Sequence, residues 1–215
     1  WNISRFVDMT TGGLRHVESV EATTLADKWI LSRLNDVIAK VTAHHEAYSL
    51  SLAGELLREF TWTDFADWYL EIAKVEKGKD DILNYILERL LILWHPFMPF
   101  VTEEIYTKFN SGRLIVAPWP QSSVIPTLPN VRAGFGGTSL FAEFAKLQNA
   151  ITAIRNIRSE YKVEPKKLVD VVLSNDSLMP YTDVICALAR VQNLVVGEKP
   201  EASASAIVGD VEVSI

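Results

Sequence analysis

Five aromatic side chains fall within residues 60–69, and this density is the most unusual chemical feature of the sequence. Aromatic rings can stack on unpaired nucleobases, and each stack contributes about 1–3 kcal/mol. At helical spacing Phe65, Trp68 and Tyr69 fall on one face, and we expect Phe65 and Tyr69 to be core residues. Trp62 precedes this face, and it is either a platform for a base or a cover on the core.

A second set of residues suited to nucleic acid lies at the start of the chain, where Asn2, Arg5 and Phe6 follow Trp1. An amide such as Asn2 can read the edge of a base, and Arg5 can pair with a phosphate or with guanine. Phe6 adds a ring for stacking beside the Arg5 cation. The alternative is an exposed Arg5 beside a buried Phe6, and we expect Trp1 to be a core residue.

Positive charge is concentrated in residues 113–168, which carry 8 Lys and Arg against 3 Asp and Glu in a chain of net charge −6. The acidic total argues against a general binder of polyanions. The basic segment is largely one expected helix, which includes Arg155 and Arg158. These two arginines are candidates for contacting RNA phosphates, and the alternative is an ordinary solvated helix face.

The sequence contains no recognisable catalytic constellation. It has no glycine-rich phosphate-binding loop and no Gly-x-Ser-x-Gly turn of hydrolases. His44 and His45 are adjacent, so on a helix their side chains diverge by about 100° and cannot chelate one metal together. The Glu-x-x-His pairs of di-iron bundles are also absent, which leaves a metal-dependent bundle enzyme as the least favoured reading. We therefore predict no catalytic residue, no metal ligand and no cofactor in this chain.

Hydrophobic periodicity predicts that the first half of the chain is helical. The opening residues resemble the end of an amphipathic helix. Thr24 and Asp27 suit the start of a helix that extends to about residue 48. Further helices are expected at about 51–74, 80–95 and 102–109, followed by a long loop over 111–138 with an extended piece at 114–116.

The pattern changes after a helix expected at 140–161, which Pro165 ends. We therefore predict a mainly α fold: an antiparallel helical bundle over 1–165, which includes this helix, and a small α/β domain over 166–215. The α/β part is expected to contain strands at 168–173 and 194–196, a helix at 177–189 and a hairpin at 206–215 that turns at Gly209 and Asp210.

The ends of the chain and its composition indicate part of a larger protein. The chain has no initiator Met or signal peptide, and it stops within an alternating pattern. Its longest apolar run falls well short of the ~18 residues of a membrane helix, so we expect no membrane contact. A single cysteine, Cys186, fits a reducing cytosol.

Five blocks of the sequence occur in the same order in one known family. They are Trp1-Asn2-x-x-Arg5-Phe6, Leu25-Ala26-Asp27-Lys28-Trp29-Ile30-Leu31-Ser32-Arg33-Leu34, Phe65-x-Asp67-Trp68-Tyr69-Leu70-Glu71, His95-Pro96-Phe97-Met98-Pro99-Phe100-Val101-Thr102-Glu103-Glu104 and Ala117-x-Trp119-Pro120. Over about residues 1–165 the chain thereby resembles the anticodon-binding bundle of valyl-tRNA synthetases, which are class I aminoacyl-tRNA synthetases. The third block favours the valyl branch over the isoleucyl and leucyl branches, although Ala66 stands where this family often has Cys.

The resemblance implies that the bundle holds the anticodon stem and loop of a tRNA. It also implies a parent enzyme that joins valine to its tRNA through valyl-adenylate, with ATP and Mg²⁺ as cofactors. The catalytic and editing domains are not in this chain, so the parent-chain catalytic domain is an expected partner, in a cytoplasmic and monomeric enzyme. The residues expected to contact tRNA are Asn2, Arg5, Phe6, Trp62, Arg155 and Arg158.

The alternative function is a structural or protein-interaction bundle. Such a bundle would brace a larger enzyme or dock a partner on its tryptophan-rich surface. Exposure of Phe6, Trp62 or Trp68 beside positive charge favours RNA recognition, whereas burial of these rings favours the structural role.

Overall fold

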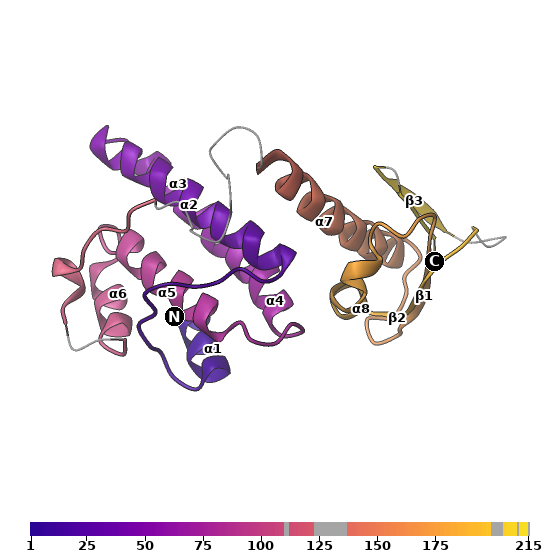
Figure 1. Ribbon diagram of the computed structural model, residues 1–215, viewed down its shortest axis with the longest axis horizontal. Helices are drawn as coiled ribbons and strands as arrows, with labels where there is room; N and C mark the ends of the chain where they lie inside the picture. Colours follow the sequence, from indigo (N-terminus) through magenta and orange to yellow (C-terminus); the bar gives the residue numbers. More distant parts are fainter. Residues whose placement is uncertain (110–111, 123–136, 199–203, 210, 215) are drawn as a thin grey trace. The chain divides into compact units, whose positions relative to one another are not determined.

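The computed structural model describes residues 1–109, 112–122, 137–198, 204–209 and 211–214 (Figure 1). The chain divides into two compact units, Trp1–Gly137 and Thr138–Ile215. The first unit is helical, and the second combines helices with a small sheet. The expectation of a mainly α chain that ends in a small α/β part is therefore confirmed.

The first unit is built from consecutive helices, with a long loop over residues 12–24 between α1 and α2 (Figure 1). Helices α2 and α3 lie side by side as an antiparallel pair, because only three residues connect them. The helices are α1 (Asn2–Thr11), α2 (Leu25–Glu46), α3 (Leu50–Glu59), the π-helix η1 (Phe60–Tyr69), α4 (Leu70–Ala73), α5 (Asp80–Trp94), α6 (Pro99–Tyr106) and the 3₁₀ turn η2 (Leu114–Val116).

Helix α2 begins where its sequence predicts. The Thr24 side chain accepts a hydrogen bond from the Asp27 N–H, and the Asp27 carboxylate accepts one from the Thr24 N–H. This reciprocal pair satisfies two N–H groups that have no partner within the helix. From there α2 buries an apolar stripe that includes Ile30, Leu34 and Val41.

The aromatic segment at residues 60–69 forms a π-helix rather than a continuation of α3. Its backbone bonds span five residues, as in the bond from the Leu70 N–H to the Phe65 carbonyl. Its buried residues recur every four to five positions, a wider step than the 3.6 residues of an α-helix. Phe65 and Tyr69 are fully buried, which confirms the prediction for them, and Trp62 faces outward.

Two local predictions in the first unit are wrong. Helix α6 begins at Pro99 and not at Thr102, because a proline at the first helical position gives up an N–H that has no helical partner there. Residues 114–116 form a 3₁₀ turn and not an extended piece, with Leu114 buried and its N–H bound to the Glu103 carboxylate. The loop expected over 111–138 lies largely outside the described residues.

The second unit begins with a long helix and ends in a four-stranded sheet of order β2-β1-β4-β3. Strand β1 pairs in parallel with β2 and antiparallel with β4, and β3 and β4 form the expected hairpin. Gly209 at its turn has a positive φ of 61°. The elements are α7 (Gly137–Glu160), β1 (Val169–Leu173), the 3₁₀ turn η3 (Met179–Tyr181), α8 (Thr182–Ala189), β2 (Val191–Val196), β3 (Ser205–Val208) and β4 (Val211–Ser214).

Helix α7 belongs to the second compact unit, whereas the sequence places it with the bundle in a domain over 1–165. The reason lies in its side chains. Arg155 and Arg158 donate to carbonyls of the α/β part, and the Tyr181 hydroxyl donates to the Glu143 carboxylate.

Among the described residues, no helix has the length and apolar content needed to cross a bilayer.

Candidate nucleic-acid interface

Helix α1 carries three of the six residues predicted to contact RNA. Its inner face is anchored against α5, since Val7 is fully buried and Ser4 nearly so, with the Ser4 hydroxyl 2.8 Å from the Trp1 carbonyl. The outer face leaves Asn2 and Arg5 exposed. The helix therefore holds these two polar side chains on a fixed, solvent-facing surface.

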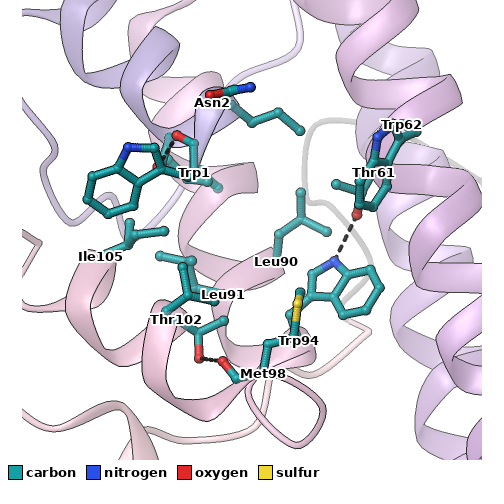
Figure 2. Close-up of a pocket in the computed structure, with 14 residues that line it drawn as sticks. Trp1, Asn2, Thr61, Trp62, Leu90, Leu91, Trp94, Met98, Thr102 and Ile105 are labelled. Atoms are coloured by element: carbon teal, nitrogen blue, oxygen red, sulfur yellow. Dashed lines mark hydrogen bonds between the residues drawn. The ribbon is translucent and has the colours of Figure 1, made fainter.

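A pocket of about 300 Å³ opens beside the start of α1, and we call it the tryptophan groove (Figure 2). In Figure 2, Trp1 and Asn2 lie on one side and Thr61 and Trp62 on the other, with Leu90 between them. Its lining residues come from α1, η1, α5 and α6: Trp1, Asn2, Ile3, Ser4, Thr61, Trp62, Leu87, Leu90, Leu91, Trp94, Met98, Val101, Thr102 and Ile105.

Trp62 lines the groove and remains accessible to solvent. Trp62 is 53% exposed and meets Trp94 edge to face, with ring centroids 6.4 Å apart. Trp94 is itself fixed, because its Nε1–H donates to the Thr61 hydroxyl at 2.9 Å. A half-exposed aromatic ring whose neighbour is fixed can stack on a planar ligand with little reorganisation.

Arg5 lies in an adjoining pocket of about 340 Å³, which we call the Arg5–Lys108 pocket. The two pockets share Trp1, Ser4 and Ile105 as common wall. Lys108, just beyond the end of α6, places its Nζ 5.8 Å from the centre of the Trp1 ring. The full lining is Trp1, Ser4, Arg5, Asp8, Met9, Leu14, Ile105 and Lys108.

Phe6 lines neither pocket. Its ring is half-buried, and the Lys74 ammonium lies 5.3 Å from the ring centre. Lys74 is in turn paired with Glu71. The structure thus brings Asn2 and Trp62 into one groove, places Arg5 next to it, and leaves Phe6 on a separate side of α1 beneath a cation.

Arg155 and Arg158 lie in the second unit, and their guanidinium groups bind backbone carbonyls. Arg158 is 8% exposed and donates to the carbonyls of Glu164, Lys167 and Arg190. Arg155 donates twice to the Leu188 carbonyl, at 3.0 and 2.9 Å. These bonds brace α7 against α8 and against the segments that precede β1 and β2, so the geometry favours a structural use of both arginines.

Three contributors to the interface are not among the residues predicted from the sequence. Trp1 was expected in the core, and this is wrong because 62% of its surface is exposed. Trp94 follows Leu87 and Leu90 at helical spacing, so that periodicity was the signal that could have identified it as part of the same face. Lys108 carries no local signal, since only the packing of the helices brings it to α1.

The described residues contain no group of three or more His, Cys, Asp or Glu side chains that could hold a metal ion. The groove is lined mainly by apolar and aromatic side chains, with an amide at its opening and cations in the neighbouring pocket. Such an arrangement can bind a planar, hydrogen-bonding group next to an anion.

A model of the family described as the anticodon-binding domain of tRNA ligase matches residues 27–173, about two thirds of the chain. The chain belongs to this family of anticodon-binding domains. The match includes most of the first unit, and it ends within β1 of the second.

Curated relatives of this anticodon-binding domain carry the name valine–tRNA ligase. One from Streptococcus pyogenes serotype M3 is 36% identical over 191 residues, which covers 80% of this chain and 21% of the relative. One from Geobacter sulfurreducens is 35% identical over 241 residues and one from Legionella pneumophila is 32% identical over 240. Both of these cover all of this chain but only 26% and 25% of the relative, so the chain spans about a quarter of their length.

A buried ionic network joins helices of the anticodon-binding domain. Asp27 is fully buried, and it accepts hydrogen bonds from the Tyr69 hydroxyl at 2.7 Å and from the Lys79 ammonium at 2.8 Å. Lys79 also contacts Thr24 and pairs with Glu76 at 2.7 Å. The network ties the start of α2 to the end of the π-helix, and so limits how far η1 can move.

Opposing effects set the pKa values in this network. Burial alone would raise the pKa of Asp27, but the hydrogen bonds from Lys79, Tyr69 and Thr24 outweigh it and hold that pKa below its usual value. Burial, followed by the charge of Asp27, raises the pKa of Tyr69 far above its usual range. Asp27 is therefore ionised and Tyr69 is a neutral donor at neutral pH.

Residues of the second and fifth sequence blocks also form polar bonds within the bundle. Arg33 of α2 donates to Asp64 of the π-helix at 2.9 Å, although burial raises the pKa of that carboxyl. The Trp119 indole N–H donates to the Thr42 hydroxyl at 2.8 Å. Many of the residues that carry the family resemblance thus build the scaffold, and fewer lie on its surface.

Proposed function

We propose that this chain recognises unpaired nucleotides in the anticodon loop of a tRNA, as part of a longer valine–tRNA ligase. The observation that carries the proposal is the tryptophan groove, with Asn2 at its opening and Arg5 in the pocket beside it. Loop bases can leave their stack, pack on aromatic rings and hydrogen-bond through their edges, which is how proteins read single-stranded RNA.

Each predicted residue has a role in this proposal. Trp62 offers a half-exposed ring in the groove, and the exposed Asn2 amide can donate to and accept from a base edge. Arg5 supplies a charged donor at the neighbouring pocket. Phe6, with Lys74 above its ring, would contact RNA at a separate point of α1. Arg155 and Arg158 are hydrogen-bonded to backbone carbonyls, so we assign them at most a minor role in binding RNA.

The proposal also covers the parent enzyme. The parent joins valine to tRNA in the cytoplasm as a monomer without membrane contact, and its catalytic domain is the intramolecular partner of this chain. ATP supplies the activation of the amino acid, and Mg²⁺ assists with the phosphates. The residues of this chain offer neither a glycine-rich phosphate loop nor, where the structure describes them, a metal-binding cluster, so we assign no catalytic step to them.

The direct test is a titration of the chain with two RNA stem-loops. One carries the valine anticodon loop, and the other has the same stem with substituted loop bases. We expect the chain to prefer the first by roughly tenfold or more, because one stacked and edge-read base contributes about 1–3 kcal/mol. Equal affinity for both would remove the claim of recognition.

A matched pair of variants sharpens this titration. Asn2→Ala removes the amide at the groove and should reduce the preference between the two loops. Asn156→Ala removes an exposed amide from α7 and should leave the preference unchanged. If both variants behave as the unaltered chain does, Asn2 does not read a base.

A protein partner for the groove is the second candidate, and the apolar lining favours it. An apolar segment of another domain could bury itself among Leu87, Leu90 and Trp94. Binding of that kind depends little on salt, whereas RNA binding weakens steeply as salt rises. A salt series on whatever ligand binds the groove therefore separates the two functions.

A further inference from the structure

The Arg5–Lys108 pocket differs in character from the tryptophan groove beside it. The groove is mainly apolar, while the pocket has two cationic side chains from separate elements, Arg5 on α1 and Lys108 after α6. One carboxylate, Asp8, accompanies them, so cations outnumber anions here in a chain of net charge −6. A local excess of positive charge within an acidic chain indicates an anionic ligand.

The geometry of Lys108 leaves its charge largely unused within the protein. Its Nζ lies 3.9 Å from the Asp8 carboxylate, at the outer limit of an ion pair, and 5.8 Å from the centre of the Trp1 ring. Both members of this pair are solvent-exposed, and exposed pairs contribute little to stability. Lys108 can therefore turn to an incoming anion without breaking a strong contact.

We propose that the Arg5–Lys108 pocket binds a backbone phosphate of RNA, the one adjoining the base held in the tryptophan groove. This inference rests on the proposed function. A base and its phosphate are separated by a single sugar, and the two pockets are correspondingly separated by the shared wall of Trp1, Ser4 and Ile105. Arg5 matches two phosphate oxygens with its planar fork, and Lys108 adds a mobile point charge.

This assignment decides between the two uses of Arg5 that the sequence allows. Guanine pairing would require Arg5 to line the groove that receives the base, and it lines the neighbouring pocket. Asp8 then has a definite role as well. Its carboxylate repels a phosphate and keeps Lys108 near the pocket when no RNA is bound, so it moderates affinity.

The test is the salt dependence of stem-loop binding by the 215-residue chain and by Lys108→Gln. We expect Lys108→Gln to lower affinity about threefold to tenfold near 0.1 M salt, equally for the valine and the substituted loop. The slope of log affinity against log salt should become shallower by about 0.7, the value for one lost phosphate contact on a single strand. Arg5→Gln should behave in the same way.

Lys40→Gln is the matched control. Lys40 is an exposed lysine of α2 that also has one carboxylate neighbour, Asp36, and its side chain is 54% exposed against 48% for Lys108. The control removes the same charge from a different surface, and its salt slope should equal that of the unaltered chain. Asp8→Asn should bind both stem-loops about twofold to threefold more tightly.

The outcomes separate this inference from the proposed function. If the unaltered chain prefers the valine loop but Lys108→Gln and Lys40→Gln have the same slope as it does, the phosphate pocket is refuted and base recognition stands. If the chain shows no loop preference but Lys108→Gln has a shallower slope and Lys40→Gln does not, the pocket stands and base recognition fails. No binding at all refutes both. Should Lys108→Gln unfold, Lys108→Arg serves instead and must keep the full slope.

Discussion

Helices α1 and α7 both carry arginines that the sequence marks as RNA contacts, and the structure uses them differently. In the second unit Arg158 is buried and bound to three carbonyls, and Arg155 is bound to a fourth. In the first unit Arg5 is exposed in a pocket that it shares with Lys108. Of the two predicted arginines in the more basic segment, Arg158 is therefore not free to contact RNA, because its guanidinium holds its own fold together.

The largest expected effect is on stability, and it comes from the buried ion pair of Asp27 and Lys79. Asp27→Ala would leave Lys79 with Glu76 as its one anionic partner among the described residues, and it would also remove the carboxylate half of the capping box of α2. We expect the free energy of unfolding to fall by about 3–5 kcal/mol, measured by urea denaturation. Asp36→Ala, an exposed carboxylate of the same helix, should cost less than about 1 kcal/mol.

The pH dependence follows from the same network. The folded pKa of Asp27 is below its unfolded value, so its stabilising effect is present above the unfolded value of about 3.9 and is lost as the pH falls through the folded pKa. Asp27→Asn should therefore lose less stability than the unaltered chain on acidification from about pH 5 to pH 3. Equal losses would show that Asp27 is not stabilised in its ionised form.

The next effect tests the bracing role of Arg158. Arg158→Met keeps the length of the side chain but removes its bonds to carbonyls, and it should destabilise the second unit by about 2 kcal/mol. Affinity for the stem-loop should not change, and Lys166→Met, an exposed neighbour, should change neither quantity. An Arg158→Met variant that is fully stable but binds RNA weakly would show that Arg158 contacts RNA and does not brace the fold.

Trp62→Ala should weaken RNA binding and leave stability nearly unchanged, which is the opposite of the effect expected for Arg158→Met. Loss of the ring face in the tryptophan groove should weaken binding of the valine stem-loop by about 1–2 kcal/mol, with little effect on the unfolding midpoint because Trp62 is half-exposed. Phe100→Ala removes a ring that is exposed on α6 and lines neither pocket, and it should leave binding intact. A large loss of stability on Trp62→Ala would assign that ring to packing.

The smallest expected effect is that of Phe6→Ala. One face of the Phe6 ring is already occupied by Lys74, so we expect RNA affinity to fall by only about 1 kcal/mol. Circular dichroism should show an unchanged helical signal. If that signal collapses, Phe6 is a core residue, and the alternative that the sequence left open applies.

Several elements of the fold could be read directly from local sequence. Thr24 and Asp27 predicted the start of α2, and the alternating pattern around Gly209 predicted the β3–β4 hairpin. The π-helix was not predicted from the sequence. Five aromatics in ten residues fit a spacing of 3.6 residues, as in an α-helix, about as well as a spacing of four to five residues. Only packing against Trp94, Arg33 and Asp27 distinguishes the two.

The candidate site also contains residues that the sequence predicted and residues that only the structure revealed. Asn2, Arg5 and Trp62 were chosen for their chemistry, and each lies at a pocket. Lys108 was not chosen, and Trp1 was placed in the core, because neither the approach of α6 to α1 nor the exposure of a ring is encoded in the neighbouring residues. Side-chain chemistry is local information, whereas proximity across elements is not.

The sequence by itself determined where helices and strands form, which rings can stack and which family the chain resembles, since periodicity, capping and motif order are properties of neighbouring residues. The tertiary structure decided which of these groups are free to act. A guanidinium that satisfies several backbone carbonyls at once, as that of Arg158 does, is held within the fold, whereas that of Arg5 lies exposed at a pocket.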